Sequence, residues 1–246
     1  LMSHFSLKNE FIFIHVPKTG GVATLDYLNR VKDLKKVQDL RDELFYERSG
    51  WDDNHYYYDT TIDTLENVYP NIDFSTVSVF GVVRNPFQRM VSMFLHRQRK
   101  PKYNTPEDQQ VLDQGFEFWL LNTQHRADKH ITTRSQLEWF DGCPVADVIC
   151  QSMLNTEWLR QVSNTPKMKA TLPIKHTSNI PIETYDDYHT EQTVKFIEEV
   201  FARDIAWGGY KSPKVMCDSC KAFACTKLRW LFMPVIRAMR VGSQIA

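Results

Sequence analysis

Two short apolar runs dominate the pattern of hydrophobic and polar positions, and each is followed by turn residues and then by helical spacing. The first run, residues 11–14, is continuous rather than alternating, which predicts a strand buried on both faces. Pro17 ends this strand because it has no N–H to donate. Gly20 and Gly21 then allow a tight turn, and apolar residues recur with helical spacing at Val22, Leu25, Leu28 and Val31. The pattern therefore predicts a strand, a glycine loop and a helix.

The predicted glycine loop has the chemistry of an anion site. The first N–H groups of a helix have no partner within it, and the helix dipole places partial positive charge there. Lys18 adds a full positive charge, and the Thr19 and Thr24 hydroxyls add donors. These features favour a bound phosphate or sulfate group, and the alternative is an ordinary strand end with a solvated lysine. Because Lys18 precedes the glycines, the loop is not a Walker A motif.

The second apolar run, residues 77–83, also predicts a buried strand that leads into a helix. Asn85 suits the N-cap of that helix, and Pro86 suits its first position. Arg84 therefore lies at the strand end and Ser92 two turns into the helix, so both can reach one phosphate. An arginine fork makes paired, charge-assisted hydrogen bonds to such a group. The apolar face of the helix consists of Phe87, Met90, Val91, Phe94 and Leu95.

These two stretches resemble the motifs of a known enzyme family. Residues 17–24, Pro-Lys-Thr-Gly-Gly-Val-Ala-Thr, resemble the 5′-phosphosulfate loop of sulfotransferases that use 3′-phosphoadenosine 5′-phosphosulfate (PAPS). Residues 84–92, Arg-Asn-Pro-Phe-x-Arg-x-x-Ser, resemble their 3′-phosphate motif. The two together are similar to the carbohydrate branch that includes heparan sulfate 2-O-sulfotransferase. The resemblance extends from about residue 11 to residue 210 and is weak between the motifs.

The resemblance implies a role for each motif residue. Arg84 and Ser92 would bind the 3′-phosphate, with Arg89 in support. Lys18 would neutralise the negative charge that develops on the bridging oxygen as adenosine bisphosphate leaves. No metal is required, because Lys18 and the backbone amides replace the cation that kinases use. The backbone amides of the loop, with the last hydroxyl, would bind the 5′-phosphosulfate through Thr19, Gly20, Gly21, Val22, Ala23 and Thr24.

In this family a histidine between the two motifs is the general base that takes the proton of the acceptor hydroxyl. His55 is the only histidine between Gly21 and Arg84, so its position favours it for this role. The ordinary pKa of histidine, near 6.5, suits such a base. The alternative is that His55 is a surface histidine in a loop.

The expected fold is an α/β three-layer sandwich with a mostly parallel central sheet and a P-loop-like nucleotide-binding core. Its ligand would bind at the carboxyl ends of the strands. Residues 1–210 would form the sulfotransferase domain, and residues 211–246 an extension of unknown role. Helical spacing predicts further helices over residues 31–48, 86–97, 111–121, 145–162 and 190–204, and a short helix or turn over 60–69.

Composition and charge limit the function classes. The 246 residues suit one large domain with an ample core. The 30 basic and 30 acidic residues give zero formal net charge, which argues against broad nucleic-acid binding. An anionic cosubstrate must therefore be bound by locally placed lysines and arginines. No run approaches the roughly 20 apolar residues of a transmembrane helix, so no transmembrane segment is predicted.

The five cysteines are odd in number and scattered, unlike a disulfide framework, so we expect reduced thiols and a cytoplasmic protein. The alternative is the Golgi lumen, where relatives of this branch carry an N-terminal anchor. Cys217, Cys220 and Cys225 have metal-ligand spacing but lack a fourth nearby ligand, so no metal site is predicted.

The acceptor is expected to be a hydroxyl, most naturally of a carbohydrate, and the oligomeric state stays open. Basic residues at positions 96–102 either complement a helix dipole or contact an anionic acceptor, such as a sulfated or uronic-acid glycan. Residues 133–140 and 172–179 resemble loops that lie near the active site in relatives. They offer Arg134 and Gln136 as acceptor contacts, and Lys175 and Ser178 as PAPS contacts.

Two other functions are compatible with a strand, an anion-binding loop and a helix in this order. A nucleotide kinase or other P-loop phosphotransferase would need the Walker A order and a strand-ending aspartate for Mg²⁺, which the sequence lacks. A non-catalytic module that binds adenosine bisphosphate would not need Lys18 or His55, and both are present.

Overall fold

The computed structural model describes residues 3–37, 39, 58–100, 104–122, 134–172, 181–210 and 227–229. Its centre is a six-stranded sheet in the order β3-β1-β2-β4-β5-β6. The strands are β1 (His4–Ser6), β2 (Phe11–Ile14), β3 (Lys35–Lys36), β4 (Ser78–Val83), β5 (Val145–Cys150) and β6 (Lys227–Arg229).

The three central strands, β2, β4 and β5, are parallel, whereas the flanking strands are antiparallel to their neighbours. β1 and β2 are joined by a tight turn at residues 7–10, and such a turn can only join antiparallel strands. The prediction of a mostly parallel sheet is therefore met in the centre of the sheet but not at its two sides. Because the central strands are parallel, their carboxyl ends meet at one edge.

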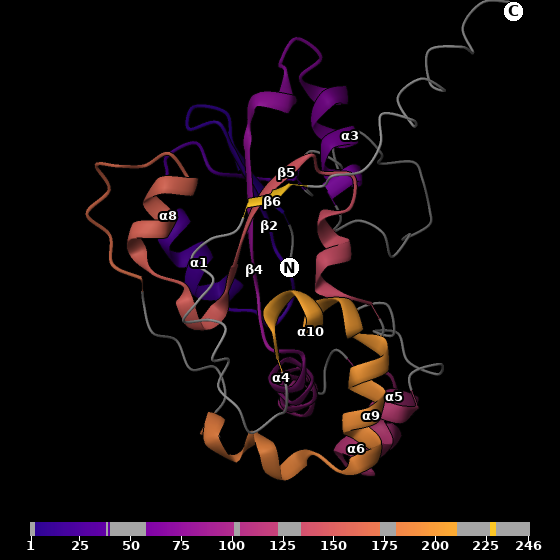
Figure 1. Cartoon of the computed structure of the whole chain (residues 1–246). Helices are drawn as coiled ribbons and strands as arrows, with labels where there is room; N and C mark the ends of the chain where they lie inside the picture. The colour runs from indigo at the N-terminus through magenta and orange to yellow at the C-terminus, as the bar shows by residue number, and fades with distance from the viewer. Residues whose placement is uncertain are drawn as a thin grey trace, which may run out of the picture.

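Helices cover both faces of the sheet, which confirms the three-layer α/β architecture (Figure 1). On one face, α1 (Gly21–Leu28) and α8 (Thr156–Val162) pack on side chains such as Phe13 and Phe80. On the other face, Ile12 and Ile14 pack with α3 (Tyr58–Val68) and the 3₁₀ helix η4 (Gln136–Phe140). Successive residues of β2 therefore serve opposite cores, as expected of a strand buried on both faces.

A separate helical cluster lies beyond the carboxyl end of β4 (Figure 1). Its core is aromatic, with the Phe94 and Trp119 ring centroids 5.5 Å apart. The cluster forms a wall beside the edge at which the parallel strands end. Its members are α4 (Pro86–Gln98), α5 (Pro106–Asp113), α6 (Phe116–Leu121), η6 (Ile182–Tyr188) and α9 (Glu191–Val200).

The predicted helix over residues 145–162 is wrong, because its first part is a strand. β5 occupies Val145–Cys150 and pairs with β4, η5 (Gln151–Met153) follows, and only α8 is helical as predicted. The apolar positions Val145, Val148 and Ile149 fit helical spacing, but pairing with β4 overrides this local preference.

Three other predicted helices differ from the structure. Lys35–Lys36, inside the predicted helix 31–48, form the edge strand β3. The helix predicted over 111–121 is two helices, with Gly115 as the N-cap of α6. The helix predicted over 190–204 is interrupted at Phe201, where α9 ends and α10 (Ala202–Gly208) begins. The helices predicted near 60–69 and 86–97 are confirmed as α3 and α4, with the short η1 (Phe74–Thr76) before β4.

Candidate functional site

The loop between β2 and α1 has the backbone that an anion site requires. Lys18 and Gly20 both have left-handed backbones, with φ of 67° and 96°. Gly20 is the N-cap of α1 and makes no side-chain cap hydrogen bond. The first N–H groups of α1 have no intrahelical partner, so they present donors and the positive end of the helix dipole at the carboxyl edge of the sheet.

The side chains of His15 and Gln151 pack against this loop, and they leave no room for a side chain at Gly21 and little at Gly20. A Cβ atom on Gly21 would lie 1.9 Å from His15 Nε2, so no side chain fits there without moving the imidazole. A Cβ on Gly20 would lie 3.3 Å from Gln151 Cγ and Nε2, in addition to the strain of its left-handed backbone. The loop is therefore packed against His15, directly after β2, and against Gln151 of η5.

The hydroxyls of the loop are used within it. Thr19 Oγ1 donates to the Val16 carbonyl at 2.8 Å, and Thr24 Oγ1 donates to the Gly20 carbonyl at 3.4 Å. Both threonines are buried. These bonds stabilise the loop conformation, while the predicted contact of the Thr24 hydroxyl with a ligand stays a prediction.

Lys18 lies among other positive charges. The pKa of Lys18 is lowered to about 8, chiefly by burial and then by the positive charges of Arg99, Arg84 and Lys100. A lysine with this pKa is still mostly protonated at pH 7. The site thus concentrates positive charge that a bound anion would neutralise.

Arg84 directly follows β4 and is only 7% exposed. Its guanidinium lies 5.6 Å from the centroid of the Tyr185 ring, and Nη1 makes a long 3.5 Å contact to the Lys18 carbonyl. Its buried Nε has no hydrogen-bond partner among the described residues. Burial lowers the pKa of Arg84, although Tyr185 opposes this shift. A buried arginine with an unused donor beside a helix N-terminus suits a phosphate group.

The α4 helix begins as predicted and ties the loop to the second strand–helix unit. Asn85 Oδ1 accepts from the Phe87 N–H at 2.9 Å and so caps the helix. Arg89 is fully buried, and its Nε donates to the Pro17 carbonyl at 3.1 Å. Ser92 is 5% exposed and lies one turn further along α4. Both anion-binding motifs therefore meet at one edge of the sheet.

A model of the sulfotransferase family matches residues 4–157, which is more than half of the chain and includes both motifs. The chain belongs to the sulfotransferase family. No curated protein and no solved structure gives a significant match. Membership of this family supports a transferase enzyme whose general activity is sulfuryl transfer.

One predicted acceptor contact of this sulfotransferase is wrong. Gln136 is 1% exposed, and both atoms of its amide bond the backbone of Arg84. It therefore faces the nucleotide motif from inside the protein and cannot face an acceptor. Sequence patterns gave no signal for this contact, because the two residues are 52 positions apart.

Several predicted residues of the sulfotransferase lie outside the described part of the chain. These include the general-base candidate His55, the predicted PAPS contacts Lys175 and Ser178, and the cysteines Cys217, Cys220 and Cys225. Of the segment 211–246, only Lys227–Arg229 is described, and it adds strand β6 to the central sheet. The described residues contain no cluster of three metal-ligating side chains and no helix long and apolar enough to cross a membrane.

The basic residues at the end of α4 belong to the surroundings of Lys18. His96 is half-buried, and its pKa is lowered to about 4, chiefly by burial and then by the positive charges of Lys18, Lys100, Arg99 and Arg97. The imidazole is therefore neutral at pH 7. Arg99 Nε donates to the Leu95 carbonyl at 3.0 Å, as expected of a basic residue that complements a helix terminus, and contact of this cluster with an acceptor stays a prediction.

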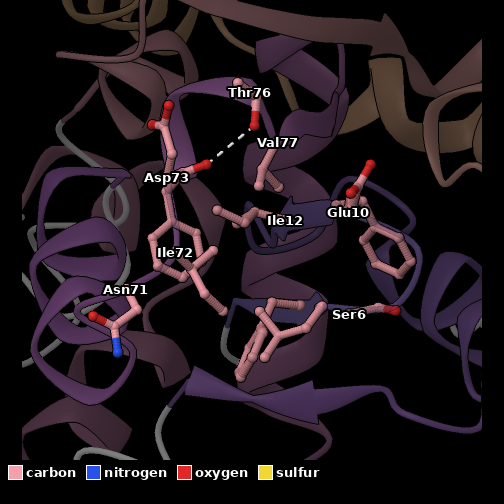
Figure 2. Close-up of a pocket in the computed structure, with 12 residues that line it drawn as sticks. Ser6, Glu10, Ile12, Asn71, Ile72, Asp73, Thr76 and Val77 are labelled. Carbon is pink, nitrogen blue, oxygen red and sulfur yellow. Dashed lines mark hydrogen bonds between the residues drawn. The ribbon is translucent and has the colours of Figure 1, made fainter.

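A pocket of about 360 Å³ lies at the other end of the strands and is separate from this site (Figure 2). It opens where β2 and β4 begin, between the β1–β2 turn and η1. Figure 2 shows Ile12 and Val77 beside it, with Asp73 at its rim, where the Asp73 carbonyl accepts a 3.1 Å hydrogen bond from the Thr76 hydroxyl. Neither anion-binding motif lines this pocket.

The buried histidine behind the loop makes stability depend on pH. His15 is 2% exposed and stacks on Phe13, and burial lowers its pKa to about 3. Between pH 6.5 and about pH 3, His15 binds a proton in the unfolded chain but not in the folded chain. The free energy of unfolding is therefore expected to decrease as the pH is lowered through this window, by about 1.4 kcal/mol per pH unit for this group.

Urea unfolding of the protein and of His15→Gln between pH 7.5 and 4 tests this expectation. The variant should lose less stability than the wild type over this range, with each protein compared to its own value at pH 7.5. The pKa values of His96 and His189 are both lowered to about 4 by burial, so a shallower slope should remain in the variant. Equal slopes in the two proteins would contradict the expectation.

Proposed function

We propose that this sulfotransferase uses PAPS as its donor and transfers the sulfuryl group to an acceptor hydroxyl of a carbohydrate. The observation that carries the proposal is the meeting of two anion-binding features at one sheet edge. These are the uncapped N-terminus of α1 behind Gly20, and the buried Arg84 with an unpartnered Nε. PAPS supplies an activated sulfuryl group together with phosphates at both its 5′ and 3′ positions.

In this proposal, the two motifs bind opposite ends of the donor. The backbone amides of residues 19–23 and the Thr24 hydroxyl bind the 5′ end of the donor, and Arg84 and Ser92 bind its 3′-phosphate. Lys18 remains protonated at neutral pH and neutralises the charge that develops on the leaving oxygen. The preference for a donor with a 3′-phosphate therefore depends on Arg84.

His55 takes the proton of the acceptor hydroxyl in this proposal. Its support is its position between the two motifs and the family resemblance. A carbohydrate acceptor is supported by the resemblance to the carbohydrate branch. The basic residues around Lys18, such as Arg99 and Lys100, would favour acceptors that carry acidic groups.

A transfer assay with PAPS labelled in its sulfuryl group tests the proposal. The acceptors are a neutral glycan, a uronic-acid glycan, a sulfated glycan and a simple phenol. We expect label on at least one glycan, with one adenosine 3′,5′-bisphosphate released per label transferred. Turnover of ATP with Mg²⁺ and no transfer from PAPS would instead support a phosphotransferase, and donor binding without any transfer would support a binding module.

Replacement of Arg84 by alanine is expected to raise the KM for PAPS about tenfold to a hundredfold while kcat changes little. The reason is that Arg84 is proposed to bind the donor away from the transferred group, and a charge-assisted hydrogen bond contributes about 1.5–3 kcal/mol. Initial rates at varied PAPS check this, with Arg30→Ala, an exposed arginine at the end of α1, as the control. An unchanged KM would contradict the 3′-phosphate assignment.

A further inference from the structure

Arg84 is the first residue after β4, and its backbone N–H and carbonyl hydrogen-bond a side chain rather than a neighbouring strand. The last paired residue of β4 is Val83, opposite Cys150 of β5. One residue later, Gln136 Oε1 accepts from the Arg84 N–H at 2.9 Å, and Gln136 Nε2 donates to the Arg84 carbonyl at 2.7 Å. The amide of Gln136 thus makes the pair of hydrogen bonds that a neighbouring strand would make, and it fixes the backbone of Arg84.

Gln136 is itself fixed by a buried carboxylate. Asp204 of α10 is 2% exposed, and its Oδ2 accepts from the Gln136 backbone N–H at 2.9 Å and from Nε2 at 3.4 Å. Its Oδ1 accepts from the Ser135 hydroxyl at 2.7 Å and from the Leu137 N–H at 3.2 Å. Every one of these groups donates to Asp204. A buried network with its members satisfied in this way is rigid.

We propose that Gln136, oriented by Asp204, is the positioning residue that directs the Arg84 side chain toward the 3′-phosphate of the nucleotide. The inference rests on the proposed function, in which Arg84 binds that phosphate. At its far end, the Arg84 guanidinium lies over the Tyr185 ring, hydrogen-bonds the Tyr185 side chain and makes a long 3.5 Å contact to the Lys18 carbonyl. At its near end, the backbone sets the direction of the Cα–Cβ bond, and the Gln136 amide holds that backbone on both sides.

A positioning role predicts a selective loss that a merely structural role would not produce. If Gln136 acts through Arg84, its loss weakens binding of ligands that carry a 3′-phosphate and spares ligands that lack it. A residue needed only for folding would lower stability and weaken both kinds of ligand alike. The ratio of the two affinities separates these cases.

The test is calorimetric titration of the full chain with adenosine 3′,5′-bisphosphate and with AMP, which lacks the 3′-phosphate. Gln136→Met keeps the length of the side chain and removes both hydrogen bonds to Arg84. We expect it to weaken bisphosphate binding about tenfold, since about 1.4 kcal/mol corresponds to a factor of ten. The affinity for AMP should change less than about twofold. If Gln136→Met does not fold, Asp204→Asn provides the same test with a smaller expected loss.

Two further variants make the outcomes distinct. Arg84→Ala should abolish the preference for the bisphosphate, and Gln136→Met should cause no further loss of preference in that background. The control is Arg203→Ala. Arg203 lies on the same helix as Asp204, and its loss removes a half-exposed ion pair to Asp141, so the preference should stay unchanged. Loss of preference in Arg84→Ala but not in Gln136→Met would overturn the inference alone, as would equal weakening of both ligands by Gln136→Met. No preference in the wild type, or an unchanged one in Arg84→Ala, would overturn the proposed function itself.

Discussion

Replacement of Lys18 by alanine is expected to lower kcat by about 10²–10³-fold, the usual cost of removing one donor to developing charge. The lysine follows β2 at the carboxyl edge of the sheet, next to the uncapped terminus of α1. In the proposed function its amine, which is still mostly protonated at pH 7, neutralises the charge that develops on the leaving oxygen. Steady-state kinetics with saturating PAPS measure this loss.

The pH profile gives a second signature of the same group. Because the pKa of Lys18 is lowered to about 8, kcat/KM should fall above that pH as the amine loses its proton. Lys18→Arg should retain part of the activity and move this decline to higher pH, since arginine stays charged. Lys8→Ala, an exposed lysine in the turn at the opposite end of β2, is the control. A kcat within a few-fold of the wild type in Lys18→Ala would contradict the assigned role.

Replacement of His55 by alanine is expected to lower kcat by about 10²–10⁴-fold, the range that a positioned general base contributes. Binding of adenosine 3′,5′-bisphosphate should stay unchanged, because His55 is assigned to the acceptor and not to the nucleotide. Transfer rates and bisphosphate titration of the same variant separate the two effects. His125→Ala, at a histidine from a different polar segment, is the matched control.

A nearly normal kcat in His55→Ala would remove it as the base. The search would then turn to His96, which is neutral at pH 7 and electrostatically coupled to Lys18. It lies on α4, one turn beyond Ser92.

The two strand–loop–helix units could be predicted because their signals are local. Continuous apolar runs define β2 and β4, glycines define the first turn, and Asn85 with Pro86 defines the start of α4. Each signal lies within a few residues of the structure that it specifies, and the motif residues follow from the same stretches. Parallel pairing of the two strands then brings the motifs to one edge.

The parts that could not be predicted depend on contacts between distant residues. β5 has apolar spacing that fits a helix, and only its pairing with β4 makes it a strand. β1 and β3 are too short to show a period of their own. The contact of Gln136 with Arg84 and with Asp204 joins residues 52 and 68 positions apart, and no local pattern marks either partner.

The central claim is that the two motifs form one site for a nucleotide with phosphates at both its 5′ and 3′ positions. Thermal unfolding with adenosine 3′,5′-bisphosphate, with AMP and with ATP–Mg²⁺ tests it most directly. A ligand present at 100 times its Kd stabilises the folded state by about 2.7 kcal/mol, which gives a visible rise in Tm. We predict a selective rise with the bisphosphate that is lost in Arg84→Ala. No rise, or a rise with ATP–Mg²⁺ alone, would contradict the assignment of the site.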